Sequence, residues 1–269
     1  MPEIPEMENY RILLQGRIQD KKILGVEVLR EKSINLPTQE FTDRLTSNAI
    51  IGLKRRAKNL IFELSNGDNL LLHLMLDGWL YWGLNSEDKP ERNSQVVLHF
   101  EEGSSLYFLG LRLGYLHLLA PNQVEEKLKD LGPEPLSESF SSETLETILS
   151  KRRGSIKALL LNQKAIAGIG NAYSDEILYE AGILPDRLLK DISETERVVL
   201  FRAIKYVLGN ATNLGGYMDH PLFEKDEHTG RMNSYFKVYG RPGEECENGR
   251  IEVMEIAGRK AHYCPGKQM

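Results

Sequence analysis

The side chains best suited to chemistry stand at the very start of the chain. It begins MPEIPEMENY, so Pro2 becomes the N-terminus if Met1 is removed, and Glu3 follows directly. A free proline carries a secondary amine, and because an α-amino group titrates near ~8, a useful fraction is neutral at pH 7. Such an amine can attack an electrophilic carbon and form an iminium, while Glu3 shuttles protons. A structural role stays open at this point, because Pro2 and Glu3 also suit the lead into a helix.

A helix and a β-sandwich are predicted to position these groups. Pro5 suits the first position of a helix over residues 5–16. From residue 20 to residue 120, short apolar segments alternate with turn signals such as Asn66-Gly67. This pattern predicts an all-β block, a sandwich or a flattened barrel.

The second half of the chain has a different pattern. Residues 131–142 are rich in proline and serine and predict a linker. Helical patterns follow, and after them come strand-like segments with turns. The predicted fold class is α+β, with a β-sandwich domain over 1–130, a linker over 131–142, a helical domain over 143–235 and a hairpin finger over 236–269.

The composition is that of an ordinary globular protein. Apolar residues make up 41% and charged residues 27% of the 269 residues, which excludes a disordered chain. The net charge of −5 argues mildly against a nucleic-acid-binding protein. Two basic clusters, Lys54–Lys58 and Lys151–Lys157, interrupt this acidic background. Such runs are usually solvated surfaces, so their place in the fold decides whether they bind an anion.

Nothing in the sequence indicates a membrane or secreted protein. No apolar run approaches the ~18 residues of a transmembrane helix, and the N-terminus lacks the apolar region of a secretion signal. The two cysteines, Cys246 and Cys264, give no disulfide framework and suit a reducing compartment. We therefore expect a cytoplasmic protein.

Segments along the whole chain resemble, in order, those of the formamidopyrimidine-DNA glycosylase / endonuclease VIII (Fpg/Nei) family. MPEIPEMENYR resembles the usual opening PELPEVE, KRRAKNLIFEL a hairpin that carries a lysine, and LGPEPL the linker. SIKALLLNQKAIAGIGNAYSDEILYEAGILP resembles the helix–two-turns–helix (H2TH) element. VYGRPGEEC and AGRKAHYCP resemble the C-terminal finger. The match runs from residue 2 to residue 268.

The resemblance implies a DNA glycosylase that is also an AP lyase. Pro2 would attack C1′ of a nucleotide flipped out of the duplex, Glu3 would assist proton transfer, and Glu6 would complete the catalytic set. The polar stretch 217–234 would cover the pocket as a lid. No cofactor is implied. The implied partner is double-stranded DNA, damaged or distorted, bound by a monomer.

The resemblance also implies a set of DNA-binding residues. The turn AGIGN precedes a helix, and backbone N–H groups at a helix start bind phosphates well. Asn171 would add a side-chain donor, although Asn is also a common helix cap. The full set is Lys58, His73, Lys157, Asn171 and Arg259.

The finger departs from the family pattern. The family carries two C-x2-C pairs, and tetrahedral zinc needs four ligands. Here Gly249 follows Cys246 and Lys267 follows Cys264 at that spacing. We expect a finger without zinc, and we expect His262 to serve hairpin packing.

The loops that fill the gap left by a flipped base also depart. The family uses a Met, an Arg and a Phe, and here Leu76, Leu111 and Leu113 stand at those positions, with Arg112 kept beside them. Arginine reads an orphan base by hydrogen bonds, whereas leucine can only wedge between bases. Discrimination of the opposite base and the usual oxidised-guanine specificity are therefore in question, and the lesion stays open.

Two other functions remain as alternatives. A DNA-structure-binding protein of the same fold would recognise branched, mismatched or distorted DNA with little base excision. A small-molecule tautomerase would use Pro2 as a general base, but it would give the basic clusters and the AGIGN turn no role.

Overall fold

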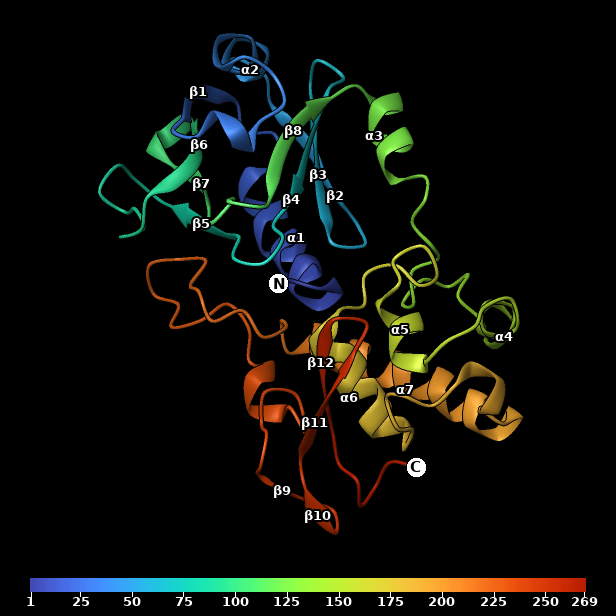
Figure 1. Ribbon diagram of the computed structural model, residues 1–269. Coiled ribbons are helices and arrows are strands. Elements are labelled where there is room, and N and C mark those ends of the chain that lie inside the picture. Colours follow the sequence, from blue (N-terminus) through green and yellow to red (C-terminus); the bar gives the residue numbers. More distant parts are fainter. The chain divides into compact units, whose positions relative to one another are not determined.

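The computed structural model describes residues 1–269 and divides them into two compact units (Figure 1). The first unit comprises Met1–Lys129 and Gly215–Arg231, and the second comprises Asp130–Leu214 and Met232–Met269. The predicted helical domain over 143–235 is therefore wrong for residues 215–231, which belong to the first unit and include residues 217–231 of the predicted lid. No helix is long and apolar enough to cross a membrane.

The first unit contains two four-stranded antiparallel sheets. One has the order β1-β6-β7-β5, with β1 (Ile23–Val28), β6 (Ser94–Phe100), β7 (Ser105–Leu109) and β5 (Trp79–Gly83). The other has the order β2-β3-β4-β8, with β2 (Ile50–Arg56), β3 (Asn59–Leu64), β4 (Asn69–His73) and β8 (Tyr115–Leu119). Their buried side chains share one apolar core, in which Phe62 and Phe108 pack edge to face.

Helix α1 (Ile4–Ile18) starts at the site and is fixed by its own sequence. Pro5 stands in the first turn, and Glu3 and Glu6 form a capping box that satisfies backbone donors at the helix start. Its apolar stripe, which includes Tyr10 and Leu14, is fully buried in the sandwich core. This confirms the predicted helix.

Short helices complete the first unit. They are α2 (Thr38–Leu45), α3 (Pro121–Leu128), and the 3₁₀ turns η1 (Glu31–Ser33) and η2 (Glu101–Gly103). The prediction of strands alone between residues 20 and 120 was wrong for α2. That helix has only eight residues and buries only Phe41 and Leu45, so its apolar pattern is too short to distinguish a helix from a strand.

The second unit is built on α4 (Ser142–Ser150), α5 (Ile156–Leu161), α6 (Asn171–Ala181) and α7 (Glu194–Asn213), with η3 (Leu189–Asp191) and η4 (Met232–Tyr235). Ser141, Ser155 and Ser193 cap three of these helices by accepting backbone N–H bonds. Two small hairpins follow: β9 (Glu245–Cys246) with β10 (Gly249–Arg250), and β11 (Glu252–Ile256) with β12 (Arg259–Tyr263).

The predicted linker is packed into the second unit. Gly132 donates its backbone N–H to the Gln163 carbonyl, and Pro133 accepts from the Ala167 N–H. Phe140 is 1% exposed. Residues 131–141 thus lack regular structure but are packed against the second unit, and residue 142 already begins α4.

Candidate active site and nucleic-acid interface

The two glutamates at the N-terminus are buried and linked to each other. Glu3 and Glu6 are each 1% exposed, and the Glu3 N–H donates to Glu6 Oε2 at 2.7 Å. The other oxygen of Glu6 accepts the Tyr217 N–H at 3.0 Å. Glu6 therefore ties the start of α1 to the segment that begins at Gly215.

We call the segment Gly215–Arg231 the lid, and residues near both of its ends contact α1. Gly216 has φ of +75°, and a Cβ added there would lie 2.2 Å from Glu6 Oε1, so only glycine fits. At the other end, Asn9 Nδ2 donates to the Thr229 carbonyl at 3.1 Å. The middle of the lid is anchored as well, because Leu222 is fully buried in the sandwich core.

A cavity of about 400 Å³ opens between the N-terminus, the lid and the loop after β4. Its lining is formed by Met1, Pro2, Leu76, Asp77, Gly78, Arg92, Tyr217, Met218, Asp219 and His220. The Tyr217 hydroxyl donates to the Met1 carbonyl at 3.1 Å. The His220 ring stacks on Trp79 with 4.5 Å between centroids, which gives the cavity a planar wall.

The electrostatics of this cavity favour a neutral amine. Burial lowers the pKa of the Met1 amine from its ordinary value of 8.0, while Glu3 and Glu6 oppose the shift and Lys58 adds to it. Pro2 is the next residue and lines the same cavity. Desolvation disfavours the ammonium form of an amine at this position, and a neutral amine is the nucleophilic form.

Lys58 and His73 lie beside this site. Lys58 occupies a two-residue turn between β2 and β3 and is only 5% exposed. Burial and then the charge of Lys58 lower the pKa of His73 to about 4, so His73 is neutral at pH 7. Its Nδ1 accepts the Met75 N–H at 3.1 Å, which leaves the proton on Nε2 as a donor.

The three predicted wedge residues have different environments. Leu76 and Leu113 are 47% and 63% exposed, which a wedge between bases requires. Leu111 is fully buried in the sandwich core, so the structure contradicts its assignment as a wedge. The two loops touch through Gly110, where a Cβ would lie 2.0 Å from the Asp77 carbonyl oxygen.

Sequence reasoning missed two residues that hold the second wedge loop. Gln95 Oε1 accepts the Leu111 N–H at 2.9 Å, and the Ser33 hydroxyl donates to the Leu111 carbonyl at 3.2 Å. Both are common polar residues distant in sequence from the loop, so no local signal marks them.

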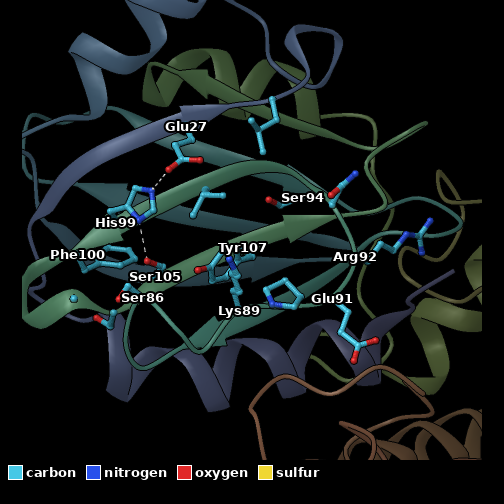
Figure 2. A pocket seen from close by; sticks show the side chains of 16 residues that line it. Glu27, Ser86, Lys89, Glu91, Arg92, Ser94, His99, Phe100, Ser105 and Tyr107 are labelled. Atoms are coloured by element: carbon cyan, nitrogen blue, oxygen red, sulfur yellow. Dashed lines mark hydrogen bonds and ion pairs between the residues drawn. The ribbon is translucent and has the colours of Figure 1, made fainter.

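A second cavity of about 710 Å³ lies on the β1-β6-β7-β5 sheet and was not predicted (Figure 2). His99 bonds Glu27 at 2.8 Å and Ser105 at 2.9 Å, and so joins three strands. A carboxylate, an imidazole and a serine hydroxyl in this order resemble the catalytic triad of a serine hydrolase. Ser105, however, lies in interior strand β7, whose backbone N–H groups are hydrogen-bonded to strands on both sides. We assign the network to sheet structure. Arg92 lines both cavities, and Figure 2 shows it pointing away from His99.

In the second unit, Lys157 corrects the sequence analysis. It is fully buried, and its ammonium group contacts Asp175 at 2.5 Å and the Ser174 hydroxyl at 2.7 Å. The second Asp175 oxygen accepts from the backbone N–H of His262 and contacts its Nδ1. A lysine paired inside the unit cannot bind DNA phosphate, so its role is structural. The assignment of His262 to packing agrees with this network.

The other two predicted phosphate ligands lie where the sequence indicates. Asn171 begins α6 after Gly170, which offers no side-chain cap, and the Asn171 Oδ1 atom has no hydrogen-bond partner. Gln163, which was not predicted, holds this turn by accepting the Gly168 N–H and donating to the Ile169 carbonyl. Arg259 is exposed beside the Ala257-Gly258 turn at the tip of the β11–β12 hairpin.

Comparison with known proteins gives the same family over the whole chain. The formamidopyrimidine-DNA glycosylase N-terminal domain matches residues 1–115, and the formamidopyrimidine-DNA glycosylase H2TH domain matches residues 131–220. Formamidopyrimidine-DNA glycosylases of Pelotomaculum thermopropionicum and Listeria monocytogenes are each 35% identical, over 98% and 100% of both chains. A solved complex of Lactococcus lactis Fpg with DNA containing an abasic site has a TM-score of 0.91 at 31% identity, over 99% of both chains.

A β-sandwich with a buried N-terminal site, combined with an H2TH domain, defines a DNA-repair glycosylase of the bifunctional class, which is also an AP lyase. The chain belongs to the formamidopyrimidine-DNA glycosylase family. The resemblance and the α+β fold class deduced from sequence motifs are therefore confirmed, and the alternative of a pure DNA-structure binder is not favoured.

Proposed function

We propose that the protein excises a damaged base with Pro2 as nucleophile, once Met1 has been removed. The Pro2 nitrogen forms a bond to C1′ of a flipped nucleotide, and the bond from C1′ to the base breaks; the nitrogen loses its proton and the departing base takes one up. Glu3 delivers a proton to the sugar as its ring opens and the iminium forms. Loss of a C2′ proton then expels the 3′ phosphate and nicks the strand, and a further elimination expels the 5′ phosphate and removes the sugar from the strand.

One observation carries this proposal. The cavity holds the chain terminus, where burial lowers the pKa of the Met1 amine and two glutamates lie buried next to Pro2. This environment increases the neutral fraction of an amine at neutral pH, and buried carboxylates beside it supply the proton transfer that iminium chemistry requires. In this arrangement Glu3 acts as the proton carrier, whereas Glu6 positions the terminus and the lid.

The lesion we propose is a ring-opened or oxidised purine. Asp77 and Asp219 bring two carboxylates to the cavity and Arg92 brings a guanidinium. Carboxylates accept from the N–H groups that such lesions display, and a guanidinium donates to their carbonyls. The formamidopyrimidine in the names of the relatives belongs to this class.

The opposite base is expected to be read weakly. Leu76 and Leu113 are exposed apolar side chains, and Leu111 is buried where an arginine would reach the orphan base. Apolar wedges unstack and kink DNA without distinguishing bases. We propose excision opposite any of the four bases, by a monomer that acts on double-stranded DNA in the cytoplasm. Lys58, His73, Asn171 and Arg259 would hold the phosphates.

Trapping with borohydride tests the proposal directly. Protein whose mass shows that it begins at Pro2 is incubated with an oligonucleotide that carries one abasic site, and borohydride then reduces any iminium to a stable adduct. The control is the same chain with an uncleaved N-terminal extension, in which the Pro2 nitrogen is part of a peptide bond and cannot attack C1′. An adduct in the first protein only supports the proposal. Tight binding without any adduct refutes it.

A further inference from the structure

The finger, residues 236–269, contains two tight turns that face each other. One turn starts at Cys246 between β9 and β10, and the other starts at Cys264 after β12. A Cβ on Gly266 would lie 1.8 Å from the Glu247 carbonyl oxygen, so the turns touch backbone to backbone. The same carbonyl lies 3.3 Å from the Cys264 sulfur.

A disulfide joins these turns. Cys246 and Cys264 are bonded with their Cα atoms 6.1 Å apart and a sequence separation of 18. This corrects the expectation that the two cysteines give no disulfide. Cys264 is fully buried, whereas Cys246 is half-buried.

The residues around the pair do not fit a zinc ion. The fourth position of each turn is Gly249 or Lys267, and neither supplies a ligand. The Lys267 ammonium lies 3.3 Å from the Glu247 carboxylate and 4.2 Å over the Tyr179 ring, so a cation already occupies this side. Residues 1–269 contain no group of three or more His, Cys, Asp or Glu suited to a metal.

The finger has little apolar core of its own. Its buried cluster consists of Val238, Ile251 and Cys264, and two-stranded hairpins are marginal in water. Glu176 holds the start of the finger by accepting three backbone N–H groups at residues 237–239. Asp175 holds β12 at His262. The segment from residue 240 to residue 256 lies between these anchors.

We propose that the Cys246–Cys264 disulfide is a modification site that takes the place of a metal in this finger, and that a dithiol reductant opens it and weakens DNA binding. The covalent loop from Cys246 to Cys264 contains the whole β11–β12 hairpin and Arg259 at its tip. Reduction of the disulfide removes this covalent restraint, so the hairpin becomes more mobile. The Arg259 guanidinium then contacts a DNA phosphate for a smaller fraction of the time. The expected effect of reduction on DNA binding rests on the proposed function.

In the thiol–disulfide exchange, the relative exposure of the two sulfurs determines which one the reductant attacks. A thiolate of the dithiol attacks the half-buried Cys246 sulfur, the S–S bond breaks, and Cys264 leaves as a thiolate and takes a proton. The second thiolate of the reductant then displaces Cys246 and closes a cyclic disulfide. Two electrons pass from the dithiol to the protein, and Cys264 stays beside the Glu247 carbonyl, which can accept its S–H.

The test uses the full chain with a duplex that contains a non-cleavable abasic analogue. The chain has only two cysteines, so dithiothreitol should raise its mass by about 2 Da through this one bond. We expect the dissociation constant to rise about tenfold on reduction, as for the loss of one ordered phosphate contact. Hydrogen exchange should become faster at residues 243–256 and stay unchanged in the sandwich.

Two variants make the result decisive. Cys246→Ser with Cys264→Ser should bind like the reduced protein and ignore dithiothreitol, and Arg259→Ala should bind weakly in both redox states. Two free thiols that persist after treatment with oxidised glutathione would overturn the inference, and so would unchanged exchange at residues 243–256. Zinc that binds the reduced chain and restores affinity would also overturn it. Failure of both redox forms to bind any DNA would instead count against the proposed function.

Discussion

Two clusters of buried charge differ in what surrounds them. In the first unit, Glu3 and Glu6 lie beside a cavity of about 400 Å³ that also contains the chain terminus. In the second unit, Lys157 and Asp175 are completely buried and bonded to each other. Both clusters fall in motifs of the same family. Buried charged groups that lie beside a cavity can take part in a reaction, whereas buried charged groups that bond one another stabilise the fold.

The largest effect should come from the terminus. Pro2→Gly exchanges a secondary amine for a primary one at the reacting atom and removes the ring that fixes its direction. We expect base excision to fall by about 10³-fold or more, with little change in the free energy of unfolding. Single-turnover excision and thermal unfolding on the same samples measure both. Excision within threefold of wild type would remove Pro2 from the mechanism.

The next largest effect should be on stability in the second unit. Lys157→Met leaves the Asp175 carboxylate buried beside an apolar side chain, and breaking a buried pair costs about 3–5 kcal/mol. The control is Lys164→Met, since Lys164 pairs with Asp130 on the surface at 2.8 Å and such pairs contribute about 0–1 kcal/mol. Denaturant unfolding distinguishes the two. Equal stability in both variants, with DNA binding reduced only in Lys157→Met, would restore Lys157 as a phosphate ligand.

A smaller effect is expected at Glu6, which acts through the residues it holds. Glu6→Gln keeps one carbonyl acceptor but places an amide where the carboxylate accepts a second N–H, so either Glu3 or Tyr217 loses its partner. We expect kcat to fall by about 10–100-fold, equivalent to about 1.5–3 kcal/mol for a hydrogen bond to a charged group. A purely structural role would lower the melting temperature and leave kcat of the folded fraction intact.

The smallest effect concerns pH. Because the pKa of His73 is lowered to about 4 in the folded protein from 6.5, the unfolded chain binds more protons between these values. Folding stability therefore falls as the pH falls from about 6.5 to about 4, and His73 accounts for about 2 kcal/mol between pH 7 and pH 5. His73→Asn should lose this part of the pH dependence, while the exposed His228→Asn should keep it. Identical profiles in the two variants would contradict the lowered pKa.

The parts of this protein that short motifs encode could be predicted from the sequence. The start of α1 combines the capping box of Glu3 and Glu6 with Pro5 in the first turn, so the helix start can be predicted from the first ten residues. The turn before α6 and the tip at Arg259 are likewise local, because glycines at fixed spacing set the backbone there. The family and the class of enzyme follow from such motifs taken in order.

Which of those side chains are buried, paired or exposed depends on the three-dimensional fold. Lys157 and Lys58 are both lysines in basic clusters, yet one is neutralised by Asp175 and the other lies near the N-terminal amine. Leu111 and Leu113 are two residues apart, yet one is in the core and the other is exposed. Burial and pairing depend on partners that are distant along the chain, as with the disulfide between Cys246 and Cys264. A local pattern carries no information about such partners, because the fold brings them together.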